Sequence, residues 1–258
     1  MRAETVEPRL PAAHAAHHSI LRLLTVGVHL AWGLAATVLI FPFASRSTRL
    51  TLRERWARTV LAGLGIELRI EGAQIDSGAL LLANHVSWLD ILVIASLTPA
   101  SFVAKSEVRC WPAIGWLAAR AETLFLRRAS GRSLLEVKNR IAGLLADGRS
   151  VAMFPEATTT NGETVLPFRS GMLQAAVDAD RPVQAIAIAY RDEQRVLSTA
   201  APFVDGTTLC GSIMAVCGAG RITACITIAA PLPPAGRTRK VLARQARGAV
   251  AAMLAARN

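Results

Sequence analysis

LLLANHVSWLDILVIASL, residues 80–97, is the segment that indicates the fold class most directly. It begins with the apolar run Leu80–Ala83, continues through a polar turn at 84–90 and ends in a second apolar run at 91–97. A short apolar run bounded by a polar turn is typical of a buried strand. The stretch therefore predicts a strand-to-helix turn at the carboxyl end of a strand, which is where α/β sheets bind their ligands.

Six further β-like runs lie along the chain, with helix-length segments between several of them. They cover residues 67–71, 101–104, 123–126, 151–154, 183–190 and 222–228. Amphipathic helices are predicted at 132–147, ending before Gly148, and at 237–257. This alternation predicts one α/β domain with a mixed, largely parallel sheet flanked by helices, and 258 residues suit such a domain with an appendage.

The residues before the first predicted strand differ in kind. No Asp, Glu, Lys or Arg interrupts residues 23–44, and about 20 apolar residues are enough to cross a bilayer core. Residues 48–66 resemble an amphipathic helix with its arginines at the lipid headgroups. We expect a flexible leader at 1–22, membrane-associated helices at 23–65 and the α/β domain at 66–258. The first helix either crosses the bilayer or forms a half-embedded hairpin with the second, and both alternatives stay open.

The charge balance also favours a membrane. Arg and Lys exceed Asp and Glu by 29 − 18 = 11, while 52% of the residues are hydrophobic. A basic surplus can serve nucleic acid, but the chain shows no basic face or motif for groove recognition, so no nucleic-acid partner is expected. Five arginines between positions 46 and 58 follow the apolar run, and the positive-inside rule then puts the domain in the cytoplasm. We expect a bacterial inner-membrane protein whose catalytic domain is cytoplasmic.

The polar turn holds two residues that suit acid–base chemistry. If Ser87 caps the following helix, Asp90 occupies its third helical position and its carboxylate can reach back to the His85 ring. Such a carboxylate fixes the tautomer of the imidazole and leaves the other ring nitrogen free to remove a proton from a hydroxyl. A capping-box variant with no catalytic role has the same spacing, and the spacing alone does not separate the two.

A second polar segment follows the run at 151–154. Residues 155–162 read PEATTTNG and residues 167–171 read PFRSG. Hydroxyls and backbone donors near Arg169 suit a phosphate or another anionic headgroup, although a plain surface loop has the same composition. Arg127 and Arg128, which close the run at 123–126, are a weaker indication of a second anion contact.

Together these segments resemble the signature blocks of the lysophospholipid acyltransferase family, which includes 1-acylglycerol-3-phosphate and lyso-ornithine lipid acyltransferases. NHVSWLD resembles the first block, an Asn-His pair followed after four residues by Asp. FVAKSE at 102–107 resembles the segment after it, LFLRR at 124–128 the second block, FPEATTTNG at 154–162 the third and RPVQAI at 181–186 the fourth. The resemblance covers roughly residues 80–190.

The resemblance implies roles for particular residues. His85 is implied as the catalytic base and Asp90 as its orienting partner. The implied acceptor-binding residues are Lys105, Arg128, Glu156, Ala157, Thr158, Thr159 and Arg169, with Arg127 as a substitute for Arg128. The chain departs from the family pattern at Ala157, where glycine is usual, at Thr159, where many members have arginine, and at Ala185, where proline is usual. Loss of the arginine removes a phosphate ligand.

The implied activity is transfer of a fatty acyl chain from acyl-CoA or acyl-carrier protein to the free hydroxyl of a lyso-lipid. The first candidate acceptor is 1-acyl-sn-glycerol-3-phosphate, which gives phosphatidic acid, and the alternative is lyso-ornithine lipid. Membrane lipids and the acyl donor are the expected partners, with no cofactor and no metal. A serine hydrolase is disfavoured because the chain has no G-x-S-x-G elbow. A non-catalytic membrane adaptor is disfavoured because His85 and Asp90 are both present.

Overall fold

The computed structural model describes residues 12–127, 130–204 and 206–256, with side chains from residue 19 onward. Seven strands form one sheet in the order β1-β7-β6-β2-β5-β3-β4. The strands are β1 (Ile66–Gly72), β2 (Leu80–Ala83), β3 (Ser101–Lys105), β4 (Leu124–Leu126), β5 (Val151–Met153), β6 (Val183–Arg191) and β7 (Ile222–Ile228). Neighbouring strands are parallel except for β6 and β7, which are antiparallel. Each β-like run is a strand, and the predicted mixed, largely parallel sheet is confirmed.

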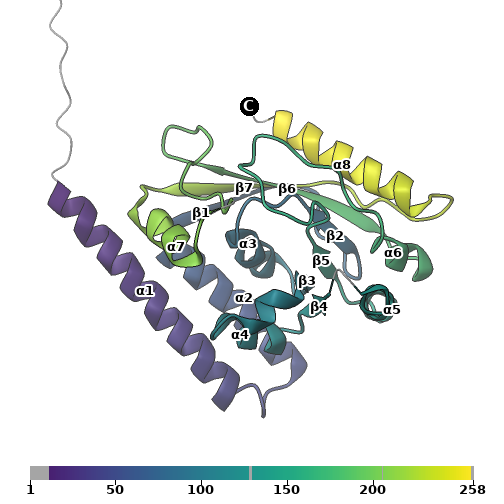
Figure 1. Ribbon diagram of the computed structural model, residues 1–258, viewed down its shortest axis with the longest axis horizontal. Helices are drawn as coiled ribbons and strands as arrows, with labels where there is room; N and C mark the ends of the chain where they lie inside the picture. The colour runs from purple at the N-terminus through teal and green to yellow at the C-terminus, as the bar shows by residue number, and fades with distance from the viewer. Residues whose placement is uncertain (1–11, 128–129, 205, 257–258) are drawn as a thin grey trace, which may run out of the picture.

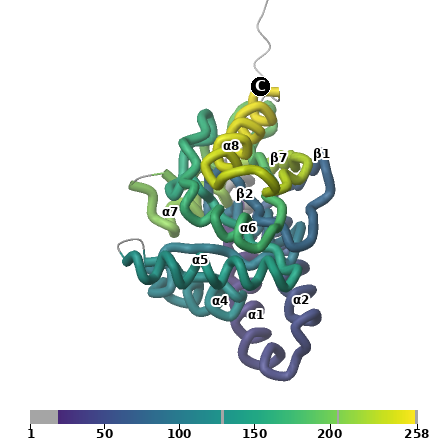
Figure 2. Tube along the Cα trace, turned by 90° about the vertical axis from the view of Figure 1, so that its right-hand side faces the viewer, coloured from purple at the N-terminus to yellow at the C-terminus, as the bar shows by residue number. Residues whose placement is uncertain are grey.

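Helices cover both faces of the sheet (Figures 1 and 2). They are α1 (Ala12–Leu39), α2 (Arg46–Gly63), α3 (Leu89–Leu97), α4 (Ile114–Arg120), α5 (Gly131–Ala146), α6 (Gln174–Asp178), α7 (Leu209–Gly218) and α8 (Arg239–Ala255), with a 3-10 turn η1 (Ser106–Cys110). The two helices predicted at 132–147 and 237–257 correspond to α5 and α8.

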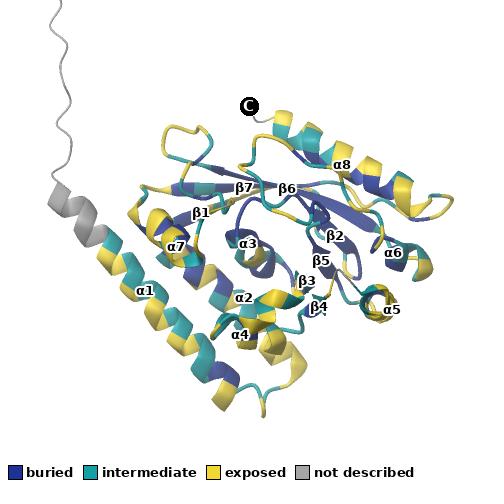
Figure 3. Cartoon of the chain, viewed as in Figure 1, coloured by how far each residue is buried: buried dark blue, intermediate teal, exposed yellow. Residues whose placement is uncertain are grey.

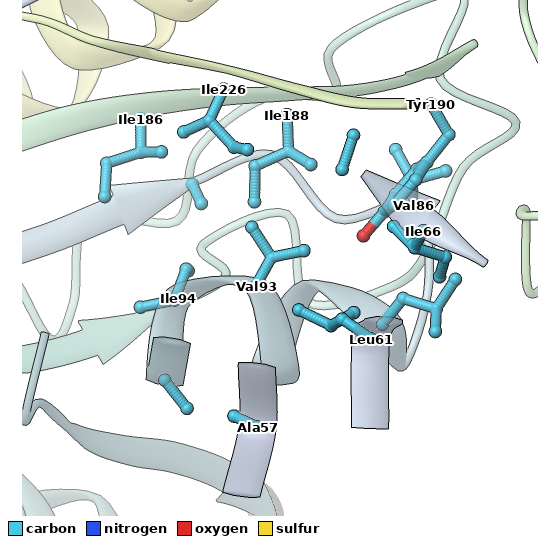
Figure 4. Packing of buried hydrophobic residues seen from close by; sticks show 14 of the residues in the cluster. Ala57, Leu61, Ile66, Val86, Val93, Ile94, Ile186, Ile188, Tyr190 and Ile226 are labelled. Atoms are coloured by element: carbon cyan, nitrogen blue, oxygen red, sulfur yellow. The ribbon is translucent and has the colours of Figure 1, made fainter. Parts of the chain in front are cut away.

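Strand β6 shows how the alternating residues of a strand serve the two layers. Its residues Ile186 and Ile188 belong to the core cluster with α2 and α3, whereas Val183 and Ala185 belong to the cluster with α5, α6 and α8. Figure 4 shows the first cluster from close by, with Ile186 and Ile188 facing Val93 of α3. Because side chains alternate across a strand, this central strand buries mostly apolar residues on both faces, and its neighbour β2 and the next strand β5 are buried as well.

Helix α1 packs along the body on one side and exposes apolar residues on the other (Figure 3). Its residues Ser19–Leu39 are long and apolar enough to cross a membrane, and only 11% of the most apolar window is buried. The inner side is attached at two points: the Trp56 indole N–H donates to the His29 carbonyl over 2.8 Å, and Arg22 donates to the Ala219 carbonyl over 2.5 Å. Leu24, among other large apolar residues, is exposed.

The arginines of α2 correct one expectation. They were expected at lipid headgroups, but Arg53 donates to the carbonyls of Ala100 and Ala121, and Arg58 donates to the Ser96 carbonyl. Ser96 lies in the last turn of α3, where unpaired carbonyls attract cations. Part of the arginine cluster therefore fastens α2 to the domain, which weakens its use as an indicator of membrane orientation.

Candidate active site

The site is built on the turn that follows β2. Asn84, the first residue after the strand, is buried and makes two hydrogen bonds with the backbone of Ile188 in β6: its amide donates to the carbonyl over 2.9 Å, and its oxygen accepts the N–H over 2.8 Å. A side-chain amide that pairs with both backbone groups of one residue replaces a rung of the ladder. It fixes where the chain leaves β2 and thereby places His85.

His85 and Asp90 are brought together as the spacing predicted. The His85 Nδ1 atom lies 2.8 Å from Asp90 Oδ2; the Asp90 side chain is fully buried, and 19% of the His85 side chain is exposed. An ionised carboxylate only accepts hydrogen bonds, so Nδ1 carries the proton and Nε2 keeps its lone pair. Within the described part of the chain, no hydrogen bond occupies Nε2. The geometry leaves a basic nitrogen available to a bound hydroxyl.

Ser87 does not cap α3, which corrects a second expectation. The helix begins at Leu89 after Trp88, and the buried Ser87 hydroxyl has no hydrogen-bond partner among the described residues. Instead, Asp90 Oδ2 accepts the backbone N–H groups of Val86 and Ser87 over 2.8 and 2.9 Å. The carboxylate thus holds the backbone of the turn and also binds the histidine, so one group makes both kinds of contact.

Glu156, from the loop after β5, braces the histidine turn. Its Oε1 accepts the His85 backbone N–H and its Oε2 accepts the Leu166 N–H, each over 2.7 Å. The residue is buried, and burial raises the pKa of the Glu156 carboxyl although the bonds from Leu166 and His85 oppose this. Both oxygens are held by the chain itself, which gives Glu156 a structural role; acceptor binding by Glu156 stays a prediction.

Two further contacts fix the His85 ring and backbone. The Phe154 ring stacks on the His85 ring, with centroids 4.0 Å apart and planes inclined by 12°. The Thr160 backbone N–H donates to the His85 carbonyl over 2.8 Å. The loop that follows β5 therefore wraps around the turn that follows β2, and the first and third blocks form one structure.

The departures from the family pattern acquire a physical meaning here. Ala157 has a φ of 65°, in the left-handed region that favours glycine, which accounts for glycine being usual at this position. The Thr159 hydroxyl donates to the Phe203 carbonyl, and the Phe203 N–H donates to the Val86 carbonyl over 2.8 Å. Thr159 thus ties a neighbouring loop to the turn that holds His85, whereas Thr158 is exposed.

The remaining predicted acceptor residues lie farther from the turn or outside the described chain. Lys105 ends β3 and is exposed, and no hydrogen bond or ion pair of the described residues joins it to the turn that holds His85. Arg169 is exposed, and its backbone N–H donates to the Pro155 carbonyl over 3.0 Å. Arg127 is exposed after β4, and Arg128 lies outside the described residues. Acceptor binding by these residues stays a prediction.

Tyr190 is a site residue that the sequence analysis missed. Its hydroxyl donates to Asp90 Oδ1 over 2.7 Å from the end of β6, a hundred residues along the chain. Burial raises the pKa of Tyr190 well above its ordinary value, and the charge of Asp90 adds to the shift. The available signal was compositional: this is the one tyrosine of the chain, and it follows the apolar run 185–189. No group of three or more potential metal ligands occurs in the part of the chain that the structure describes.

The chain is similar to several known proteins. A family model described as Acyltransferase matches residues 65–189. A lyso-ornithine lipid O-acyltransferase of Pseudomonas aeruginosa is 39% identical over 235 residues, which cover 90% of this chain and 89% of the relative. A 1-acyl-sn-glycerol-3-phosphate acyltransferase of Neisseria meningitidis is 40% identical over 138 residues, which cover 53% of this chain and 54% of the relative. The crystal structure of a 1-acyl-sn-glycerophosphate acyltransferase from Thermotoga maritima matches with a TM-score of 0.69 and 21% identity over 95% of this chain and 96% of that one, and thus shares the fold.

Proposed function

Because the chain belongs to the acyltransferase family and is an O-acyltransferase, we propose that it moves a fatty acyl group from a thioester to the hydroxyl of a lyso-lipid, with His85 as general base. The observation that carries the proposal is the 2.8 Å contact between His85 Nδ1 and Asp90 Oδ2, which leaves Nε2 basic and accessible. A paired imidazole of this kind removes a proton from a hydroxyl near neutral pH.

The reaction proceeds in two steps. His85 Nε2 takes the proton of the acceptor hydroxyl as the oxygen attacks the thioester carbonyl, which gives a tetrahedral intermediate. The intermediate collapses as the C–S bond breaks, and the leaving thiolate takes the proton from the imidazolium. Asp90 stabilises the imidazolium between the two steps. The products are the acylated lipid and the free thiol of coenzyme A or acyl-carrier protein, and the steps involve no cofactor and no acyl-enzyme.

We propose lyso-ornithine lipid as the acceptor. A relative named for this activity is similar over nine-tenths of the chain, and relatives from Rhizobium meliloti and Brucella abortus carry the same name. The site chemistry agrees, because Thr159 replaces a phosphate-binding arginine and its hydroxyl is used to bind the Phe203 carbonyl. An acceptor without a phosphate loses nothing from this replacement.

Lysophosphatidic acid, the first candidate from the sequence, is the second candidate here. The Neisseria meningitidis relative is named for that acceptor and is as similar in sequence, although over about half of each chain. The side chains of Arg127 and Arg169 are exposed and accessible to anionic groups in solution or at a membrane surface. A phosphate monoester could be held by them in place of the missing arginine at position 159.

We further propose that α1 binds the membrane without leaving the body of the protein. Its attachments through Arg22 and Trp56 keep it against α7 and α2, while Leu24, Val28 and Trp32 are exposed on its other side. Such a helix can embed its outer face in one leaflet and hold the active site at the interface, where a lyso-lipid resides. The bacterial inner membrane and a cytoplasmic catalytic domain remain the proposed location.

The proposal is tested with purified membranes that contain the protein or its His85→Ala variant. Each is given acyl-CoA or acyl-carrier protein with either lyso-ornithine lipid or lysophosphatidic acid, and products are identified by mass spectrometry. We expect ornithine lipid from the wild type and none above background from the variant. Phosphatidic acid as the main product would make lysophosphatidic acid the first candidate acceptor and lyso-ornithine lipid the second. Transfer that persists in His85→Ala would refute the base, and no transfer to either acceptor would favour the non-catalytic adaptor.

A further inference from the structure

We propose that Tyr190 is a positioning residue that sets the basicity of His85 by hydrogen bonding to Asp90. The inference rests on the proposed role of His85 as general base and extends the catalytic pair to a third residue. Tyr190 lies outside the Asn-His and Asp pattern by which the site was recognised in the sequence. It comes from β6, whereas His85 and Asp90 both come from the turn after β2.

The three side chains form a continuous hydrogen-bonded path. The Tyr190 hydroxyl donates to Asp90 Oδ1 over 2.7 Å, and Asp90 Oδ2 lies 2.8 Å from His85 Nδ1. The two oxygens of the Asp90 carboxylate accept hydrogen bonds from different groups. Oδ2 serves the histidine and two backbone N–H groups, while the tyrosine is the one side chain that donates to Oδ1 in the described structure. Figure 4 shows Tyr190 projecting from its strand into the layer that holds Val86, with its hydroxyl oxygen turned into that layer.

The surroundings make Tyr190 a constant donor. Its side chain is fully buried, and its pKa is raised well above 10 by burial and by Asp90, so the hydroxyl keeps its proton throughout the range in which the enzyme works. The other ionisable group that faces the pair is Glu156, which accepts the His85 backbone N–H. The backbone N–H groups of Val86 and Ser87 complete the set around Asp90. Of these partners, Tyr190 alone can lose its hydrogen bond by deletion of a single atom.

The direction of the effect follows from the charge on Asp90. A hydrogen bond to Oδ1 withdraws electron density from the carboxylate and makes it a weaker partner for a protonated His85. Without that bond, the carboxylate stabilises the imidazolium more strongly, and His85 holds its proton to higher pH. More of the enzyme is then in the form that cannot accept a proton from the acceptor. Tyr190 therefore keeps the base free at the pH of the reaction.

The first test is the Tyr190→Phe variant of the full-length enzyme, assayed across a range of pH. We expect the acid limb of kcat/KM to move up by about half to one pH unit. A hydrogen bond to a charged carboxylate is stronger than one between neutral groups, and the difference in free energy corresponds to a pKa change of about this size. We expect kcat near neutral pH to fall about three- to tenfold. KM for both substrates should not change, since the buried Tyr190 touches neither. An unshifted acid limb, or an effect confined to KM, would overturn the proposal.

A matched variant separates positioning from mere packing. Ile186→Val shortens a buried residue on the same strand and the same face as Tyr190. The two residues are four positions apart, and the substitution removes no hydrogen bond to Asp90. We expect it to lower the thermal midpoint without any movement of the acid limb. If Tyr190→Phe behaves as Ile186→Val does, with activity that follows only the folded fraction, the tyrosine is structural and the inference is wrong.

The composition of the chain permits a second test that needs no substitution. Because the chain has one tyrosine, growth on 3-fluorotyrosine labels residue 190 alone. The fluorinated phenol is more acidic and therefore a stronger donor, so the acid limb should move down in pH, opposite to Tyr190→Phe. The fluorine resonance should titrate together with His85 and lose that titration in His85→Ala. A resonance indifferent to His85 would overturn the coupling.

The two readouts keep this inference apart from the proposed function. The fluorine titration reports the coupling between Tyr190 and His85 whether or not acyl transfer is being measured. If His85→Ala keeps its activity while the titration is present, the base assignment fails and the hydrogen-bonded path stands. If the base assignment holds and the titration is absent, this inference alone fails.

Discussion

Two carboxylates organise two different regions of the molecule, Asp90 at the turn that holds His85 and Glu122 beside α2. Asp90 is fully buried and accepts from a histidine, a tyrosine and two backbone N–H groups. The Glu122 side chain is 36% exposed and forms ion pairs with Arg46 of α2 and with Arg149 before β5. Burial by itself would raise the pKa of Glu122, but the bond from Arg46 and the charges of Arg149 and Arg53 lower it.

The difference between the two carboxylates shows how environment assigns roles. Asp90 has one titratable cation-forming partner, His85, which is partly accessible to a substrate. Glu122 is surrounded by permanent cations whose protonation does not change, so it can hold segments together but cannot tune a reactive group. Asp90 is accordingly expected to govern rate and Glu122 to govern stability. The predictions below test that division.

The largest expected effect is the loss of activity in His85→Ala, by about 10²–10⁴-fold in kcat, which is the usual range for general acid–base catalysis. The fold should survive, because Asp90 keeps its bonds from Val86, Ser87 and Tyr190. The measurements are acyl transfer and thermal unfolding of the same preparation. Asp90→Ala serves as the contrast, since it strips the acceptor from all four donors and should lower both activity and stability.

Glu156→Gln should lower stability by about 1–3 kcal/mol. In the wild type each carboxylate oxygen accepts one backbone N–H, from His85 or Leu166. In the variant the side-chain NH2 group replaces one of these oxygens, so one of the two N–H donors loses its acceptor. Chemical denaturation measures the change. Activity should fall as well, since the His85 backbone loses its brace. Glu163→Gln, an exposed change on the same loop, is the control and should leave stability within about 0.5 kcal/mol. Equal stability of Glu156→Gln and its control would contradict the bracing role.

Glu122→Gln should lower stability by about 1 kcal/mol or less, because the ion pairs are partly exposed and screened by solvent. The effect should depend on pH in a defined direction. A lowered pKa in the folded state contributes stability above the unfolded value of about 4.3, and this is lost as the pH falls below it. The wild type and the variant should therefore converge in acid. Acyl transfer should stay near the wild-type rate, and a large loss of activity would break the division between the two carboxylates.

Glu67→Gln is the matched control for that measurement. Glu67 pairs with Arg221 over 3.1 Å, and both side chains are more than half exposed. The change removes the same charge from a pair that is better hydrated, so we expect a smaller effect on stability. If Glu67→Gln lowers stability as much as Glu122→Gln does, the ion pairs of Glu122 with Arg46 and Arg149 contribute no more than an ordinary surface pair.

The same comparison explains how much of the molecule could be predicted from the sequence. The seven strands follow from local apolar runs, and the His85–Asp90 pair lies within five residues, so both were accessible to pattern and spacing. Tyr190 and Glu122 reach their partners only after the sheet has formed, across 100 residues from Asp90 and 76 from Arg46. Spacing carries no information about such contacts. The arginines of α2 were misplaced for the same reason, because the carbonyls that bind them, those of Ser96, Ala100 and Ala121, come from segments distant in the sequence.

Position 157 offers the most local test of how far the loop after β5 tolerates backbone strain. Ala157 holds a φ of 65°, which costs an L-residue about 1 kcal/mol or more, whereas glycine adopts it freely but loses more entropy on folding. Ala157→Gly should therefore raise stability by up to about 1 kcal/mol, measured by denaturation, with activity unchanged. Ala113→Gly, at a φ of 59° and a ψ of −51° in a γ-turn before α4, relieves backbone strain in a different segment and should give at least as large a gain. If only Ala157→Gly altered the rate, the strained backbone of the loop after β5 would be part of how the catalytic turn is held.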